Sequence, residues 1–306
     1  MPITRRLVLS ASAVLAAGAL LPRRLWAVTT LTLGDLRIDT VSDGTLELPA
    51  SFLTDRLPEA ERAELIARYG IPADRLVNPV NVTLMRQGDR VALFDVGSGP
   101  DFMPTAGKLT EALAAIGIAP DDVTDVVFTH AHPDHLWGLL DEFDEPVFAN
   151  ARLQMGAAEH AFWTDPATPA AIGEAGQAFA AGAARRLAAV GDRMQRFEPE
   201  AEVLPGVRAV ATPGHTPGHT SFAIGAPDGG VMVIGDAISN AMYAFARPDL
   251  PGGGDQDAAM AAQTRQALMA RLADEGWRLI GYHLPEGGIG RCVRQGDAYA
   301  FVPEAG

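Results

Sequence analysis

Four apolar segments of this sequence each end in a cluster of histidine or aspartate, and no other feature limits the possible folds as strongly. The clusters lie at His130 and the residues after it, at His215, at Asp236 and at His283. Side chains just beyond the ends of strands gather along one edge of a sheet, which is where α/β proteins build their sites. We therefore expect these clusters to converge although they are far apart in the sequence.

The segments between the clusters alternate between strand-like and helix-like patterns. Residues 81–99 indicate two strands joined by a Gly-Asp turn. Residues 105–118, 173–190 and 256–276 have the spacing or composition of helices. Such alternation is consistent with an α/β fold in which helices cover sheets on both sides.

The densest cluster places four metal-ligating side chains directly behind an apolar run: His130, His132, Asp134 and His135. Imidazole and carboxylate groups are good ligands for zinc and similar divalent ions. Pro133 breaks regular strand pairing, so the sequence predicts a loop that turns the first two side chains toward one ion and the last two toward another. A solvated polar loop is the alternative, but protonated histidines so close together would repel one another.

Composition excludes several classes of function. A single cysteine, Cys292, rules out a disulfide within the chain and a thiolate-rich metal site. The formal charge of −14 disfavours nucleic acid as a partner. The sequence has no Gly-x-Ser-x-Gly motif, so a serine nucleophile of that kind is not indicated. A small-molecule substrate is expected instead.

The N-terminal segment has the layout of an export signal. Arg5 and Arg6 precede an alanine-rich apolar run that ends at Leu21, and no acidic residue occurs before Asp35. We interpret residues 1–27 as a signal of the twin-arginine type, followed by one domain over residues 28–306. The protein would then be periplasmic or secreted, without stable membrane insertion after cleavage. An uncleaved anchor or a simple N-terminal helix is the alternative, and the cleavage point is left open.

The motifs HAHPDH, TPGHTPGH, IGDA and GYH, in this order, resemble those of the metallo-β-lactamase-fold hydrolases. The resemblance extends over residues 32–303 and implies an αββα sandwich of two similar halves, with two divalent metal ions at one edge. Zinc is the first choice, and manganese, iron and cobalt also suit the ligands. The implied ligands are His130, His132 and His215 for one ion, Asp134, His135 and His283 for the other, and Asp236 as the bridge.

Within this superfamily, the segments EHAFW, RPDLPGGGDQD and GYHLPEGGIG are similar to methyl parathion hydrolase and related secreted organophosphate hydrolases and lactonases. That likeness implies a substrate pocket lined by Phe162 and Trp163. The sequence departs from it at Gly252–Gly254, where bulky apolar residues are expected, and at Glu286 and Gly287, where an aromatic residue and a proline are expected. We expect both departures to lie near the mouth of the substrate pocket.

Three further residues near the motifs are interpreted as supporting ones. His219 follows His215 by four residues and is assigned a structural role behind the ligands. His160, in a predicted helix, is assigned to the surface or to packing. Tyr282 adjoins a predicted ligand and is assigned to packing.

The predicted reaction is hydrolysis by a hydroxide that bridges two metal ions. Such ions lower the pKa of bound water from about 15.7 to about 7. Asp134 and Asp236 are the predicted catalytic residues, which orient the hydroxide and accept its proton. The expected substrate is a phosphotriester, an aryl ester or a lactone. The alternatives are a β-lactam or thiolester hydrolase and a non-catalytic metal-dependent binding protein. The oligomeric state is left open, and a homodimer is among the states allowed.

Overall fold

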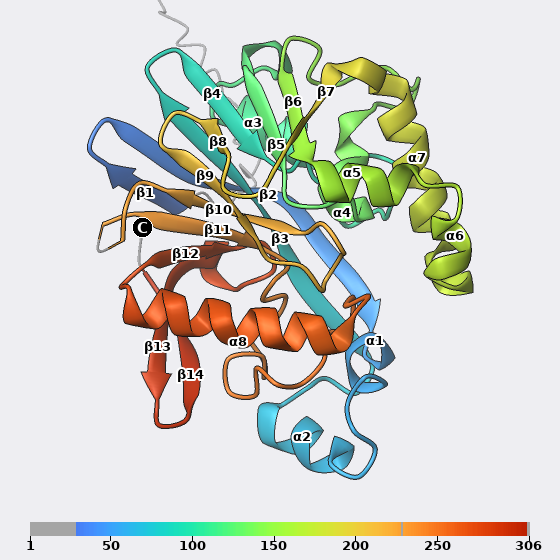
Figure 1. The fold of residues 1–306 in the computed structure, drawn as a ribbon, viewed down its shortest axis with the longest axis vertical. Coiled ribbons are helices and arrows are strands. Elements are labelled where there is room, and N and C mark those ends of the chain that lie inside the picture. The colour runs from blue at the N-terminus through green and yellow to red at the C-terminus, as the bar shows by residue number, and fades with distance from the viewer. Residues whose placement is uncertain (1–28, 228, 305–306) are drawn as a thin grey trace, which may run out of the picture.

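The computed structural model describes residues 29–227 and 229–304, which form four layers in the order αββα (Figure 1). Two seven-stranded sheets pack face to face, with strand orders β1-β2-β3-β4-β5-β6-β7 and β14-β13-β12-β11-β10-β9-β8. The predicted fold class is therefore confirmed. The predicted export signal, residues 1–27, lies outside the described residues. Among the residues described, no helix has both the length and the apolar character needed to cross a bilayer.

The first half of the chain forms one sheet and most of the helices. Its strands are β1 (Thr29–Leu33), β2 (Leu36–Pro49), β3 (Arg75–Gln87), β4 (Arg90–Phe94), β5 (Asp125–Phe128), β6 (Arg152–Gly156) and β7 (Met194–Phe197). Strands β1 to β4 pair antiparallel and β4 to β7 pair parallel. Its helices are α1 (Ser51–Thr54), α2 (Arg62–Tyr69), α3 (Leu109–Ala115), α4 (Pro133–Leu136), α5 (Ala157–Thr164), α6 (Thr168–Ala171) and α7 (Gln177–Val190).

The second half forms the other sheet and one long helix. Its strands are β8 (Glu202–Leu204), β9 (Val207–Ala211), β10 (Thr220–Ile224), β11 (Val231–Gly235), β12 (Arg278–Gly281), β13 (Ile289–Gln295) and β14 (Ala298–Pro303), and its helix is α8 (Ala258–Asp274). Only β11 and β12 pair parallel in this sheet, as far as the structure describes it.

Three apolar layers hold the fold together. Between the sheets, Phe94 and Val127 pack with Phe222 and Ile280. On the outer face of the first sheet, α3 and α7 bury side chains such as Leu113 and Leu187. On the outer face of the second sheet, α8 buries side chains such as Leu268 and Leu272. Buried apolar surface is the main favourable term in folding, so these layers fix the sheet edges that carry the site.

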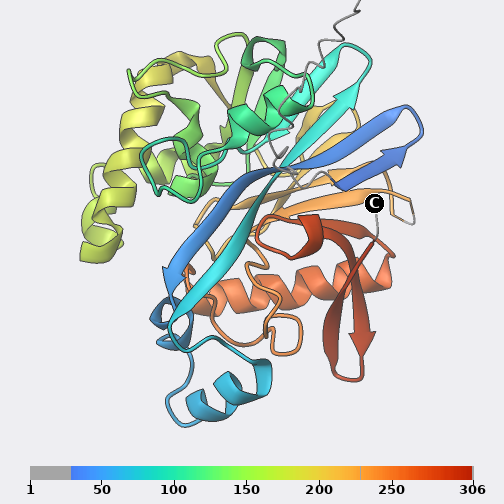
Figure 2. The same cartoon turned by 180° about the vertical axis from the view of Figure 1, so that it is seen from behind.

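The long β2–β3 hairpin extends past the rest of the first sheet and carries α1 and α2 at its end (Figures 1 and 2). Leu53, Leu65 and Leu76 form a small apolar cluster there with Tyr243 of the second half. This extension brings α1 to the side of the molecule on which the strand ends gather.

Most elements follow the sequence pattern, and the exceptions have local causes. The strands predicted within residues 81–99 are β3 and β4. The helix predicted over residues 105–118 is the shorter α3, because Gly107 (φ 73°) and Gly117 (φ 80°) adopt left-handed backbone conformations at its two sides. The predicted helix 173–190 begins as α7 at Gln177, after a 3₁₀ turn.

Candidate metal centre

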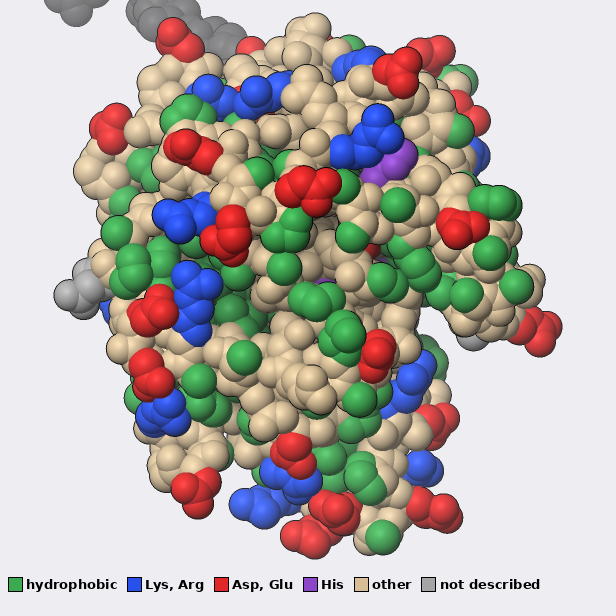
Figure 3. Space-filling model, viewed as in Figure 1, with side chains coloured by type: hydrophobic (Ala, Val, Ile, Leu, Met, Phe, Trp, Pro, Cys, Tyr) green, Lys and Arg blue, Asp and Glu red, His purple; other side chains and the backbone are tan. Residues whose placement is uncertain are grey.

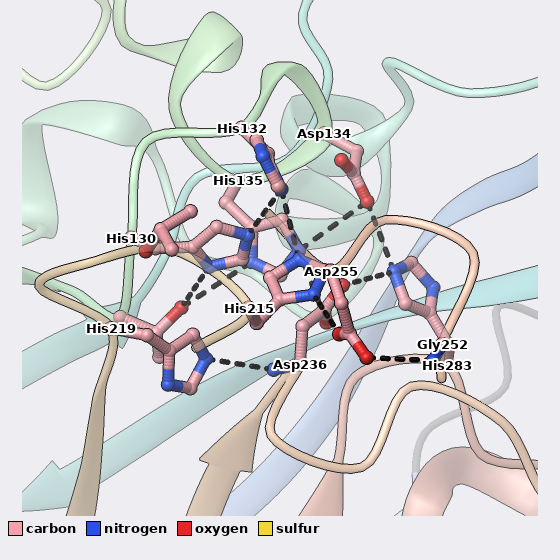
Figure 4. A network of polar contacts seen from close by, with 12 residues as sticks. His130, His132, Asp134, His135, His215, His219, Asp236, Gly252, Asp255 and His283 are labelled. Carbon is pink, nitrogen blue, oxygen red and sulfur yellow. Dashed lines mark hydrogen bonds and ion pairs between the residues drawn. The ribbon is translucent and has the colours of Figure 1, made fainter. Parts of the chain in front are cut away.

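Seven buried side chains from segments far apart in the sequence meet at one edge of the two sheets (Figure 4). They follow strand β5 (His130, His132, Asp134 and His135), lie between β9 and β10 (His215), or follow β11 (Asp236) and β12 (His283). The predicted convergence of the four clusters is therefore observed.

The segment after β5 is more regular than the predicted loop. His132 has an extended backbone and precedes the one-turn helix α4, whose first residue is Pro133. Proline suits this position because its fixed φ matches a helix and its missing N–H has no partner in the first turn. The helical turn separates Asp134 and His135 from the two preceding histidines. The division of these four side chains between two ions stays a prediction.

Three histidines form the first group of ligand atoms. His130 Nε2 lies 3.0 Å from His132 Nδ1, which lies 2.9 Å from His215 Nε2. Nitrogen ligands about 2.0–2.1 Å from a zinc ion lie roughly 3.3 Å from one another in a tetrahedral site. The three ring nitrogens therefore have the spacing of a three-histidine metal site.

The second group lies beside the first, and Asp236 lies between them. His283 Nε2 is 3.1 Å from Asp134 Oδ2, and His135 Nε2 is 3.4 Å from the same oxygen. Asp236 places Oδ1 3.4 Å from His135 Nε2 and Oδ2 3.4 Å from the Nε2 atoms of both His215 and His283. This carboxylate thus contacts both groups, as a bridging ligand must.

The unsatisfied polar atoms of the site show what it is built to hold. Asp134 Oδ2, His135 Nε2 and Asp236 Oδ1 are buried, and among the described residues none of them makes a hydrogen bond of good geometry, although ring nitrogens and carboxylate oxygens of the site lie close by. Buried polar atoms are nearly always paired, so three orphans that face one another need an explanation. A set of imidazole nitrogens and carboxylate oxygens around them fits two divalent cations of the zinc type.

Electrostatics divide the histidines into two kinds. Burial, together with the neighbouring histidines, holds the pKa of His130 and of His132 well below the ordinary value, so these rings stay neutral. Burial also opposes charge on His283, but Asp236 and Asp134 outweigh it and raise the pKa of His283 to about 10. The two carboxylates therefore favour positive charge at this point, which a divalent cation would supply.

Most of the ligand rings have a partner for the nitrogen that faces away from the centre. His130 Nδ1 lies 3.0 Å from Thr129 Oγ1, and His283 Nδ1 lies 2.8 Å from the carbonyl oxygen of Pro79. His135 Nδ1 lies 2.8 Å from Asp95 Oδ2. An acceptor at this position fixes the N–H on the outer nitrogen and leaves the inner lone pair free for a cation.

Glu159 is a residue of the site that the sequence did not reveal. Its buried carboxylate accepts hydrogen bonds from Ala131 N (2.9 Å), between two ligands, and from Thr216 Oγ1 (2.7 Å) and Gly218 N (3.0 Å), on the loop of His215. Trp163 Nε1 donates to it as well, at 2.6 Å. One carboxylate therefore ties the ligand loops of the two halves together.

The supporting roles assigned to His219 and Tyr282 have clear contacts. His219 Nε2 accepts a hydrogen bond from the backbone N–H of Asp236 at 3.0 Å, and burial lowers the pKa of His219 to about 3. Tyr282 donates to the carbonyl oxygen of Asp134 at 2.7 Å and stacks on His135, with ring centroids 3.8 Å apart. Both residues hold ligands in place from behind.

A cavity of about 1070 Å³ opens from the centre to the surface. Its lining includes Phe162 and Trp163, as the sequence predicts for these two residues, and the ligands His132, Asp134, His215, Asp236 and His283. Hydrophobic side chains also gather over the projecting α6–α7 part of the molecule at one side of this face (Figure 3). Of the 7 histidines, His160 takes no part in the centre and is half-buried on α5.

The two sequence departures have different places. Gly253 and Gly254 line the cavity, as expected. A Cβ on Gly254 would lie 2.8 Å from His215 Cε1, so this glycine allows close packing on the ring of His215. Gly287 instead packs so closely against Thr29 and Thr40 that a Cβ there would lie 2.2 Å from Thr29 Oγ1. Neither Glu286 nor Gly287 is among the residues that line the cavity. The expectation that residues 286–287 lie at the pocket mouth is wrong.

Comparison with known proteins places the chain in a family. The family model described as "Metallo-beta-lactamase superfamily" matches residues 75–281. The N-acyl homoserine lactonase AiiB of Agrobacterium fabrum is 26% identical over 156 residues, which cover 42% of this chain and 51% of that protein. The match therefore spans about half the length of that relative.

Two solved structures share the whole fold. The structure of "AidC, a Dizinc Quorum-Quenching Lactonase" has a TM-score of 0.83 and 25% identity, and the match covers 92% of this chain and 98% of that chain. The hydrolase AbOPH, "in beta lactamase superfamily", has the same TM-score and identity, with 93% and 99% covered. Since the family model covers more than half of the sequence, this chain belongs to the metallo-β-lactamase superfamily.

Proposed function

We propose that this protein is a hydrolase that uses two divalent metal ions, zinc being the first choice, to cleave an ester-type bond in a small, largely apolar molecule. One observation carries the proposal: three orphaned buried atoms and their histidine neighbours face one another beside a large, partly apolar cavity. The names of the relatives support it, because AiiB is a lactonase and AidC is a dizinc lactonase.

In the proposed site, His130, His132 and His215 would hold one ion and Asp134, His135 and His283 the other. Asp236 lies near both groups and would contribute to holding both ions. Two divalent ions supply an attacking oxygen derived from water and polarise the oxygen of the scissile group.

The chain's own carboxylates do the remaining work in this proposal. Asp134 and Asp236 both line the cavity and lie at the ligand cluster, so they can orient the attacking water and accept its proton. Glu159 and His219 act from behind, by fixing the ligand loops and the backbone of Asp236.

The cavity walls indicate the class of substrate. They are rich in large apolar side chains, among them Leu48, Phe52, Phe102, Phe162, Ile172 and Phe179. Trp163 lies deeper, with 1% of its surface exposed and its ring edge-to-face with His132 at 5.7 Å. Such walls suit a substrate with an apolar tail or an aryl group, and a cavity of about 1070 Å³ accommodates it. We place lactones first, because both AiiB and AidC are lactonases, and phosphotriesters and aryl esters second, on the sequence likeness to organophosphate hydrolases.

A panel of substrates tests the proposal. Purified protein is assayed with N-acyl homoserine lactones of short and long acyl chain, an aryl ester, a chromogenic phosphotriester, a thiolester and a chromogenic β-lactam. Each assay is run as prepared, after chelation, and after zinc is restored. We expect the highest kcat/KM on a lactone with a long apolar chain, loss of activity with chelator, and recovery with zinc.

The other readings give different results in the same assay. Turnover that survives complete metal removal would overturn the metal-dependent mechanism. Faster turnover of a β-lactam or a thiolester would place the protein with other hydrolases of this fold. Bound metal without turnover of any substrate would favour a binding protein.

We also propose that the protein is exported, on the basis of Arg5, Arg6 and the apolar run after them. N-terminal sequencing of the protein recovered from the periplasm is expected to begin near residue 28. Recovery from the cytoplasm with an intact N-terminus would contradict export.

A further inference from the structure

We propose that the loop of residues 252–257 positions two ligands of the first metal group and thereby sets the affinity of that metal position separately from the other. Asp255 holds the ring of His215, and Gln256 holds the ring of His132. The inference rests on the proposed two-metal function and adds positioning residues to it.

Asp255 contacts His215 from inside the protein. Its Oδ1 lies 3.1 Å from His215 Nδ1, and both side chains are almost fully buried (Figure 4). A carboxylate acceptor at Nδ1 fixes the N–H on that nitrogen, so that Nε2 presents its lone pair to the cluster with His132 Nδ1. The contact also prevents rotation of the ring about its bond to the backbone.

Asp255 is in turn held rigidly. Arg265 of α8, with 2% of its surface exposed, donates to Asp255 Oδ2 at 2.7 Å. The same guanidinium donates to the carbonyl oxygens of Pro248 and Leu250, and the backbone N–H of Gly252 donates to Asp255 Oδ2. A buried carboxylate with this many fixed donors has one orientation. Its contact with Nδ1 therefore also fixes the orientation of the His215 ring.

Gln256 performs the same role for His132. The structure places its side-chain amide nitrogen, Nε2, 3.4 Å from His132 Nε2, the nitrogen that faces away from the cluster. When Nδ1 of His132 binds a cation, Nε2 of that ring carries the proton and donates. The amide of Gln256 is then turned over, so that Oε1 takes the nearer position and accepts. The other amide position has no hydrogen-bond partner in the part of the chain that the structure describes, so the contact with His132 decides the orientation of the amide.

The loop acts on one metal position because both of these contacts go to the first group. Its backbone is also tied to that group, since Gln256 N donates to the carbonyl oxygen of His215 at 3.1 Å and Asp257 N donates to that of Gly214 at 2.9 Å. The outer nitrogens of the second group have other partners, Asp95 for His135 and Pro79 for His283. Substitutions in the loop should therefore change the metal affinity of the first position and leave that of the second unchanged.

The test measures zinc occupancy at each position in the variants Asp255→Asn, Gln256→Leu and Gln256→Glu. Anomalous diffraction at the zinc edge reports each position in the crystal, and competition with a chromogenic chelator gives the affinities in solution. We expect Asp255→Asn and Gln256→Leu to weaken zinc binding at the first position about 10- to 100-fold and to leave the second position unchanged. Gln256→Glu keeps an oxygen acceptor and is expected to retain wild-type binding.

The matched control is Asp39→Asn, because Asp39 is also buried and paired with arginines, Arg37 and Arg86, but contacts no ligand in the part of the chain described. Asp39→Asn is expected to leave zinc binding unchanged at both positions. If Asp255→Asn does not fold, Gln256→Leu and Gln256→Glu decide, because Gln256 is only half-buried and lies in a loop.

Wild-type occupancy at both positions in Asp255→Asn and Gln256→Leu would overturn the inference, and so would equal loss from both positions. A wild-type protein that binds no zinc would instead overturn the proposed function.

Discussion

Asp236 is the residue whose carboxylate lies close to both groups of ligand atoms. Its Oδ1 approaches His135, whereas its Oδ2 approaches both His215 and His283. Its backbone N–H donates to His219. We expect Asp236→Ala to lower zinc content and hydrolysis together, by more than the 10- to 100-fold typical of an outer partner. Metal analysis and kcat/KM on the best substrate of the panel check this.

Asp274→Ala is a suitable comparison for Asp236→Ala, because Asp274 is an exposed aspartate paired with Arg294 at the end of α8. It should keep both zinc content and activity. Full activity in Asp236→Ala would contradict a bridging role.

At the scale of single residues, the ligands could be predicted from sequence but their partners could not. His130, His132 and Asp134 form a dense motif of ligand types behind an apolar strand, and that pattern is rare without a metal. Glu159 and Asp255 are single acidic residues among 38, and only their contacts in the folded chain reveal their roles. For Glu159 a weak signal existed, since Trp163 follows it by four residues on the same helix face.

At the scale of elements, helix α8 begins beside the metal centre, because its N-cap residue Asp257 donates a backbone hydrogen bond to Gly214, next to His215. Asp257 Oδ1 accepts a hydrogen bond from Met260 N at 2.9 Å and so caps the helix. Asp257→Ala is expected to lower the free energy of unfolding by about 1 kcal/mol, because one N–H of the first turn loses its acceptor. Urea unfolding measures the change.

Asp274→Ala, at the exposed other end of α8, should lower the free energy of unfolding by less, because a surface substitution away from caps and buried contacts changes stability little. An equal loss in both variants would show that the cap contributes no more than a surface ion pair.

Element boundaries departed from the sequence prediction where tertiary contacts intervene. Helix α3 begins at Leu109 rather than near residue 105, because the buried carboxylate of Asp43 accepts hydrogen bonds from the N–H groups of Gly107 and Leu109. Asp43 lies far away on β2, so no local pattern could show this. The strands, in contrast, were predictable, because continuous apolar runs such as β5 and β11 are buried throughout.

At the scale of the whole molecule, the metal centre joins the two halves of the sandwich. His130 and Asp134 come from the first half, and His215 and His283 come from the second. Each cation bound between them stabilises only the folded state, by about 2.7 kcal/mol for a free metal concentration of 100 Kd. For a chain of this length we expect chelation to lower Tm by roughly 5–10 °C for each cation removed.

Differential scanning calorimetry before and after chelation measures this shift, and added zinc should restore the original Tm. An unchanged Tm in protein shown by metal analysis to be free of zinc would contradict a stabilising role of the centre.

Glu159 fixes the two ligand loops to each other from behind, whereas the cavity walls come from α1, α5, α7 and the segment around Gly253 in front. The side chain of Trp163 both donates a hydrogen bond to Glu159 and lines the cavity. Mutation could therefore reshape the walls over evolutionary time without disturbing the chemistry behind them. A lineage with this arrangement can acquire new substrates by changing its front face, and a protein engineer can do the same.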